Sequence, residues 1–138
     1  MQLWVLYAIL AAFCAALVAV FGKIGIKDVD PTLVTAVRAV IMAVVLVGVA
    51  LLFGKFSSVE TLIGRPLLFI VFSGLAGALS WFFYFLALKY GPASSVAALD
   101  RTSVVLVVLL AALFLGESLT IKAGVGAVLI LVGALLFI

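Results

Sequence analysis

The sequence predicts an all-α membrane protein with five transmembrane helices, formed as a single domain by residues 1–138. The first observation behind this prediction is composition, because 70% of the residues are hydrophobic and only 9% are charged. Soluble domains are roughly 45–50% apolar and about 25% charged. A chain this short has too large a surface to hide so many apolar side chains from water. We therefore expect a multi-pass integral protein of a bacterial or archaeal inner (plasma) membrane, with the lipid bilayer as a partner.

The second observation is that charged and turn residues divide the chain into five apolar runs. A spanning helix needs about 20 mostly apolar residues, whereas strands of a membrane barrel have about 10 residues of alternating polarity. Helices are therefore favoured over strands, although the last run is short unless it begins near Thr120. The five runs are Leu3–Phe21, Thr32–Phe53, Leu67–Leu88, Ser94–Leu115 and Ala123–Ile138.

Proline and polar residues lie where these helices are predicted to begin. Proline is well suited to a first helical turn, where its missing N–H group would have no partner. Ser94 and Ser95 are candidate caps for the fourth helix. Glu117 is predicted to cap the turn that follows that helix, with a coupling carboxylate as the alternative. The three prolines are Pro31, Pro66 and Pro92.

The distribution of loop cations leaves the orientation of the chain open. Membrane proteins normally keep an excess of lysine and arginine on the cytoplasmic side. Here each side of the five-helix topology has three loop cations, as in a dual-topology protein that inserts both ways round. If Arg38 and Arg101 also count, the ratio becomes five to three, and a fixed orientation is expected. The two sets are Lys23, Lys27 and Lys89 against Lys55, Arg65 and Lys122.

Several classes of function lack their residues in this sequence. The chain has one cysteine and no histidine, so we expect no metal site, no haem and no other cofactor. A net charge of +3, scattered along the chain, gives no reason to expect nucleic acid as a partner. No nucleophile–base pair or phosphate-binding loop is apparent, so the chain is predicted not to be an enzyme.

Four charged residues lie inside or at the ends of the apolar runs, near one side of the membrane. A charge at mid-bilayer costs about 2.5–3.5 kcal/mol on insertion scales. We therefore expect Asp100 to pair with Arg38 or Arg101 and the group to face a polar, net-positive cavity that binds a substrate. The alternatives are an ion-pair lock between helices and snorkelling, which suits arginine but not the short Asp100. The four residues are Lys23, Arg38, Asp100 and Arg101.

The aromatic run SWFFYF at residues 80–85 lies in the third predicted helix. Trp81, Tyr84 and Leu88 share one helix face by their spacing. Trp81 and Tyr84 are predicted to line the substrate cavity, and an interfacial aromatic belt facing lipid is the alternative.

Small residues mark predicted helix contacts. Gly126 and Gly133 are one heptad apart, with Leu129 and Ile130 between them, and small residues allow helix backbones to approach closely in lipid. These four residues are the predicted dimer interface, with packing inside the monomer as the alternative. In the third helix, the pair Gly74 and Gly77 predicts a close crossing with an unnamed helix.

Four stretches, in this order, resemble the EamA-type domain of the drug/metabolite transporter superfamily: GKIGIKDVDPTLVTAVRAV, WFFYFLALKYGPASSVAAL, LFLGESLT and GVGAVLILVGALL. The resemblance covers nearly the whole chain. It implies one five-helix repeat of a fold that commonly has two inverted repeats, and thus a half-size transporter of small organic solutes. Many such repeats have a proline in the fourth helix, and RTSVVLVV has none.

A single repeat needs a second half, and inverted repeats place the substrate between two oppositely oriented halves. We therefore expect an antiparallel homodimer that transports a small molecule, with anionic or zwitterionic solutes favoured by the net positive cavity. The alternative is a non-transporting membrane subunit, or half of a heteromeric transporter. The spacing of Gly126 and Gly133 also resembles the dimer helix of small multidrug resistance proteins. Their first-helix glutamate is missing here, because residues 1–22 contain no acid.

Overall fold

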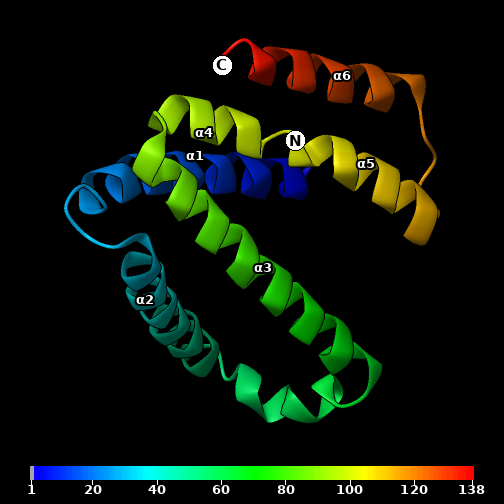
Figure 1. Cartoon of the computed structure of the whole chain (residues 1–138). Helices are drawn as coiled ribbons and strands as arrows, with labels where there is room; N and C mark the ends of the chain where they lie inside the picture. The colour runs from blue at the N-terminus through cyan, green and yellow to red at the C-terminus, as the bar shows by residue number, and fades with distance from the viewer. Residues whose placement is uncertain (1) are drawn as a thin grey trace. The chain divides into compact units, whose positions relative to one another are not determined.

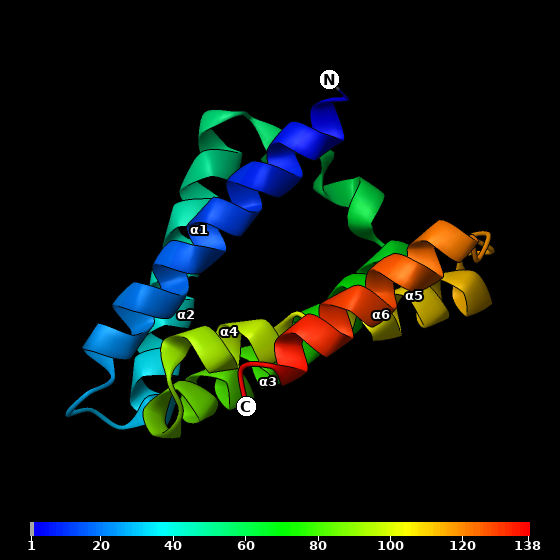
Figure 2. The ribbon, with the colours of Figure 1, turned by 90° about the horizontal axis from the view of Figure 1, so that it is seen from above.

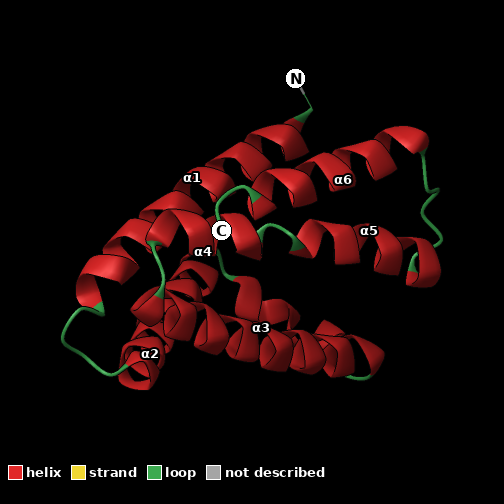
Figure 3. Cartoon of the chain, turned by 45° about the horizontal axis from the view of Figure 1, so that its top comes forward, coloured by secondary structure: helices red, strands yellow, loops and turns green. Residues whose placement is uncertain are grey.

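The computed structural model describes residues 2–138 and shows helices joined by short connections, with no strand in that range (Figures 1 and 3). The prediction of an all-α chain is therefore confirmed. The elements are α1 (Leu3–Gly25), α2 (Pro31–Leu52), the 3₁₀ helix η1 (Lys55–Leu62), α3 (Arg65–Tyr90), α4 (Ala93–Asp100), α5 (Ser103–Phe114) and α6 (Ile121–Leu135).

Four helical segments are long and apolar enough to cross a membrane: α1, α2, α3, and Ala93–Phe114, which comprises α4 and α5. The shortest has 22 residues, which at 1.5 Å per residue is roughly 33 Å, against a hydrocarbon core of about 30 Å. Helices suit this setting because lipid offers no partner for backbone polar groups. Most large apolar side chains are exposed, and lipid is the solvent that suits such a surface.

The fifth apolar segment, α6, is shorter than the other four. Its 15 residues extend roughly 22 Å, less than the thickness of the hydrocarbon core. The Thr120 side chain accepts a hydrogen bond from the backbone N–H of Ala123 and so fixes the start of the helix. Thr120 is therefore a cap outside the helix, and the capping of the preceding turn by the Glu117 side chain stays a prediction. The backbone N–H of Glu117 donates to the carbonyl of Ala111.

Helices α2 and α3 begin at or next to the predicted prolines. Pro31 is the first residue of α2, and the Asp30 side chain accepts hydrogen bonds from the N–H groups of Thr32 and Leu33 at 2.9 and 3.1 Å. Two backbone donors that have no partner inside the helix are thereby satisfied. Helix α3 begins at Arg65, one residue before Pro66.

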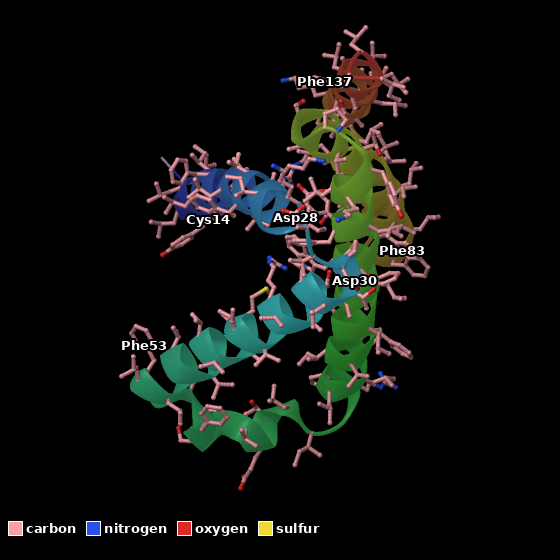
Figure 4. All side chains as sticks on the ribbon, turned by 60° about the vertical axis from the view of Figure 1, so that its left-hand side comes forward. Cys14, Asp28, Asp30, Phe53, Phe83 and Phe137 are labelled. Carbon is pink, nitrogen blue, oxygen red and sulfur yellow. The ribbon has the colours of Figure 1, made fainter. Side chains whose placement is uncertain are left out.

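The start of α4 differs from the prediction. Pro92 is the N-cap residue and no side chain caps the helix, so the assignment of Ser94 and Ser95 as caps is wrong. The Ser95 hydroxyl donates instead to the carbonyl of Phe137, at 2.8 Å. This bond joins α4 to the segment that follows α6, and Figure 4 labels Phe137 there.

The fourth apolar segment is broken near its middle, although it contains no proline there. Helix α4 ends at Asp100 and α5 begins at Ser103. Around the break, backbone N–H groups bond to carbonyls three residues back, as in Thr102 to Leu99 at 3.0 Å. The Thr102 hydroxyl also donates to the carbonyl of Leu99, at 2.7 Å. This tighter 3₁₀-type turning interrupts the α-helix.

The chain divides into two compact units, which we describe separately. Unit 1 comprises the residues up to Ile24 together with Tyr90–Ile138, and unit 2 comprises Gly25–Lys89. In unit 1, α6 packs antiparallel to α5 and also contacts α4 (Figures 1 and 2). The buried residues of these three helices are small or β-branched, as close helix packing in lipid requires. They are Val96, Ala111, Ala127 and Ala134.

In unit 2, α2 and α3 come close at the Asp30 end of α2 and diverge toward η1, which bridges their far ends (Figures 1 and 4). Phe53, labelled in Figure 4, lies at the wide end. The segment 54–66, expected as a loop, thus contains a short helix of exposed residues. The sides of α2 and α3 that face each other form the site described next.

Candidate functional site

The Arg38 guanidinium lies over the indole ring of Trp81. Its central carbon is 3.7 Å from the centroid of that ring and 5.4 Å from the centroid of the Phe85 ring. Both distances fall within the range of a cation–π interaction, which is stronger where water is excluded. Arg38 is half-buried and Phe85 is fully buried. Two residues of α3 therefore hold the one charged side chain of α2, about two turns from the start of that helix.

The aromatic rings of α3 support this pair. Tyr84 meets Trp81 edge to face at 5.5 Å between ring centroids, and Phe85 lies 6.1 Å from each of these two rings. Such edge-to-face pairs are favourable beyond the area that they bury. Phe83 lies on the side of α3 that faces away from α2 (Figure 4). The aromatic run thus splits between two faces, and Trp81 and Phe85 are on the face toward Arg38.

A cavity of about 740 Å³ adjoins Arg38 between α2 and α3. Small-molecule sites usually measure about 300–1,000 Å³ and are mostly apolar, with a few polar groups that orient the ligand. The polar groups here are the Arg38 guanidinium, the Trp81 indole and the hydroxyls of Thr32 and Thr35. The Thr35 hydroxyl donates to the carbonyl of Pro31, at 2.8 Å. The lining residues are Thr32, Thr35, Ala36, Arg38, Ala39, Met42, Ala43, Leu46, Gly74, Gly77, Ala78, Trp81 and Phe82.

Small side chains on both facing stripes leave room for the cavity, with three alanines on α2 and two glycines and an alanine on α3. The lining positions repeat every three or four residues along each helix, which places them on one face. A Cβ atom built on Gly74 or Gly77 would meet no other atom within 4 Å. Within unit 2, open space lies beside these glycines, and the close crossing with another helix stays a prediction.

Lys23, a predicted substrate-binding residue, makes a structural contact. Its Nζ donates to the backbone carbonyl of Gly91 at 2.8 Å, which joins the end of α1 to the turn before α4 in unit 1. Substrate binding by Lys23 stays a prediction.

Lys89 has a similar role in unit 2, which the sequence reasoning missed. Its Nζ donates to three carbonyls of the segment between α1 and α2. The acceptors are Ile26, Lys27 and Val29, at 3.0, 3.0 and 3.2 Å. A lysine at the end of one helix, followed by a turn, was the available signal, since lysine often bonds terminal carbonyls.

Asp100 and Arg101 lie at the break between α4 and α5, and both side chains are exposed. Three predicted site residues, Arg38, Trp81 and Tyr84, lie together in unit 2. The other three, Lys23, Asp100 and Arg101, belong to unit 1. An ion pair between Asp100 and Arg38 or Arg101 stays a prediction. Phe85 was missed, although it follows Trp81 by one helical turn.

On α6, the predicted dimer residues lie beside the face that packs within the chain. Ala127 and Ala134 are buried, and residues one position earlier point about 100° away from them. Gly126 and Gly133 hold those earlier positions. A Cβ atom on either glycine would meet nothing within 4 Å, so no other part of unit 1 needs them to be small. Leu129 and Ile130 are exposed.

The sequence of the chain is similar to those of known transporter proteins. The sequence model of the EamA-like transporter family matches residues 2–138. A Sinorhizobium protein, named as an uncharacterized transporter in the cobO 3′ region, is 40% identical over 135 residues. Those residues cover 98% of this chain and 96% of that protein, so the relative is similarly short. No solved structure matches the chain.

Proposed function

Because the chain belongs to the EamA-like transporter family, we propose that it carries a small organic solute across the membrane, working as an antiparallel homodimer. Membership in a transporter family, with several apolar helices and a bacterial relative, identifies a multi-pass integral protein of a bacterial inner membrane. It also points to transport rather than catalysis. The solute and the dimer are our proposal.

The observation that carries the proposal is Arg38 over Trp81 beside an apolar cavity. A cation in the middle of a membrane-spanning helix is costly, and such residues usually mark a substrate or ion pathway. The net positive charge of Lys23, Arg38, Asp100 and Arg101 favours anionic or zwitterionic solutes. In the proposed dimer, these residues line each half.

Two features support a second, oppositely oriented copy. Inverted-repeat transporters bind their substrate between two halves of opposite orientation, and this chain has the length of one half. The glycines of α6 have open space beside them, which a second α6 could fill through Gly126, Leu129, Ile130 and Gly133.

The second candidate is a non-transporting subunit or half of a heteromeric transporter. The five-to-three count of cations, with Arg38 and Arg101 included, favours it, because a fixed orientation forbids an antiparallel pair of one chain.

Proteoliposomes that contain only the purified chain test the proposal. We expect uptake of labelled organic anions or zwitterions above that of protein-free vesicles. Arg38→Ala and Asp100→Ala should each abolish uptake while the protein still inserts, and Lys55→Ala, a change in η1 outside the cavity, should have no effect. Absence of uptake by the wild-type chain would overturn self-sufficient transport. Unchanged uptake in Arg38→Ala would remove the site assignment.

A further inference from the structure

We propose that the α2–α3 cavity is selective for organic anions of a single negative charge, a carboxylate or sulfonate on a compact apolar body. Zwitterions, cations and dianions are excluded by the same lining. This inference rests on the proposed function, since it names the solute class of the same site.

The charge of the cavity lining favours a ligand with one negative charge. Arg38 is the one ionisable side chain among the residues that line the cavity, all of which belong to the described part of the chain. A charge on a half-buried side chain beside an apolar surface is stabilised by a partner of opposite charge. One anion neutralises one guanidinium. Within unit 2 a second negative charge would have no partner, and neither would the ammonium group of a zwitterion or a cation, because the residues that line the cavity include no carboxylate and Asp100 belongs to unit 1.

The planar shape of the guanidinium favours a carboxylate or sulfonate group on the ligand. Its central carbon lies over the Trp81 ring, 3.7 Å from the ring centroid, and its N–H donors spread outward in the guanidinium plane. A planar fork of donors matches the two oxygens of a carboxylate or sulfonate, and such bidentate pairs are strong. Trp81 therefore acts as a positioning residue that holds this fork at the cavity wall.

The remaining lining residues favour an apolar body for the ligand. Beyond Arg38, the lining consists mainly of alanine, glycine and large apolar side chains such as Met42, Leu46 and Phe82. Burial of hydrocarbon against an apolar surface makes the free energy of binding more favourable. Extra hydroxyl or amide groups that find no hydrogen-bond partner there make it less favourable. A volume of about 740 Å³ accommodates a ring-sized body.

A series of probes with permanent charges tests this selectivity. The full-length chain with Trp4→Phe keeps Trp81 as its single tryptophan, because the sequence contains two. The fluorescence of Trp81 is titrated in lipid nanodiscs with benzenesulfonate, benzene-1,3-disulfonate, phenylalanine and benzyltrimethylammonium. We expect benzenesulfonate to bind at least about tenfold more tightly than the other three, which corresponds to one charged hydrogen-bond pair. Equal or tighter binding of any of the other probes would overturn the proposal.

Three variants assign the binding to this cavity. Arg38→Met should weaken benzenesulfonate binding on the order of tenfold to a hundredfold. Gly77→Leu should fill the cavity and produce a similar loss, and Ala43→Leu does the same from α2 if the first variant does not fold. Gly48→Leu is the matched control, because Gly48 is a glycine of α2 with open space beside it that does not line the cavity. Benzenesulfonate binding that survives both Arg38→Met and cavity filling would overturn the assignment.

Transport of the same probes separates this inference from the proposed function. Selective binding of benzenesulfonate without uptake into proteoliposomes supports the ligand class and overturns the proposed transport. Uptake of phenylalanine but not of benzenesulfonate overturns the ligand class and leaves the proposed transport standing.

Discussion

At the scale of single residues, Arg38 shows how one charge is accommodated in an apolar helix. Its guanidinium gains a cation–π contact with Trp81 and a second aromatic ring, Phe85, nearby. The aromatic rings hold the charge without neutralising it, so an anionic ligand still gains from binding there.

Replacing Trp81 tests the positioning role. In Trp81→Leu the guanidinium loses its aromatic support, and we expect uptake of benzenesulfonate to need an about 2- to 30-fold higher concentration, as a cation–π contact of about 0.5–2 kcal/mol implies. Uptake into proteoliposomes measures this, with Trp4→Leu as a matched control because Trp4 lies in α1. An unchanged half-saturating concentration would show that Trp81 does not position Arg38.

Lys89 is a second residue whose hydrogen bonds can be tested, because they are expected to stabilise the segment at residues 26–29. Lys89→Met removes three hydrogen bonds to the carbonyls of residues 26–29 and should destabilise that segment by about 1–2 kcal/mol. The measurement is amide hydrogen exchange in nanodiscs, which should become faster at residues 26–34. Lys27→Met, at an exposed position of the same segment, is the control. Equal exchange in the two variants would contradict a specific role of Lys89.

The sequence predicted the importance of Arg38 but not its geometry. A cation inside an apolar run is visible in the sequence, because it is costly wherever the helix packs. The stacking of Arg38 on Trp81 was not visible, since the relative rotation of two separate helices depends on packing that no local pattern encodes. The cavity was missed for a related reason. Gly74 and Gly77 indicate little bulk, and this suits a close crossing and an open space equally well.

At the scale of secondary structure, helix ends were well predicted because polar and turn residues are rare in this chain. Pro31 and Thr120 therefore mark a boundary clearly, whereas Ser73 and Ser80 lie inside α3. The break after Asp100 was not predicted, because it contains neither proline nor glycine and depends on 3₁₀-type hydrogen bonds that include the Thr102 hydroxyl. Helix η1 was missed because it is short and has exposed residues.

The start of α2 carries a prediction at this scale. Asp30→Ala removes the side-chain oxygen that caps two backbone N–H groups, and loss of such a cap costs about 0.5–2 kcal/mol. Hydrogen exchange at Thr32 and Leu33 should accelerate accordingly. Asp28→Ala provides the comparison, because Asp28 lies in the same loop and does not cap α2 (Figure 4). Protection that is equal in the two variants would show that Pro31 alone is sufficient to start the helix.

At the scale of the whole molecule, the cavity beside Arg38 lies within Gly25–Lys89, and the glycines of α6 have space beside them. A single five-helix chain has the length of one half of the inverted-repeat fold that its family resemblance implies. The equal number of loop cations on the two sides is the feature that permits both orientations in one membrane. Transport by an antiparallel pair of this chain alone requires insertion in both orientations.

Accessibility of single cysteines tests the central claim most directly, which is that two copies of this chain insert in opposite orientations. In a Cys14→Ser background, Ser118→Cys and Asp28→Cys place one thiol on each side of the membrane in any one orientation and leave every loop cation in place. Intact bacterial cells are labelled with a membrane-impermeant maleimide. We predict that roughly half of each variant is labelled from outside, because the loop cations give no bias. Complete labelling of one variant and none of the other would contradict the antiparallel homodimer.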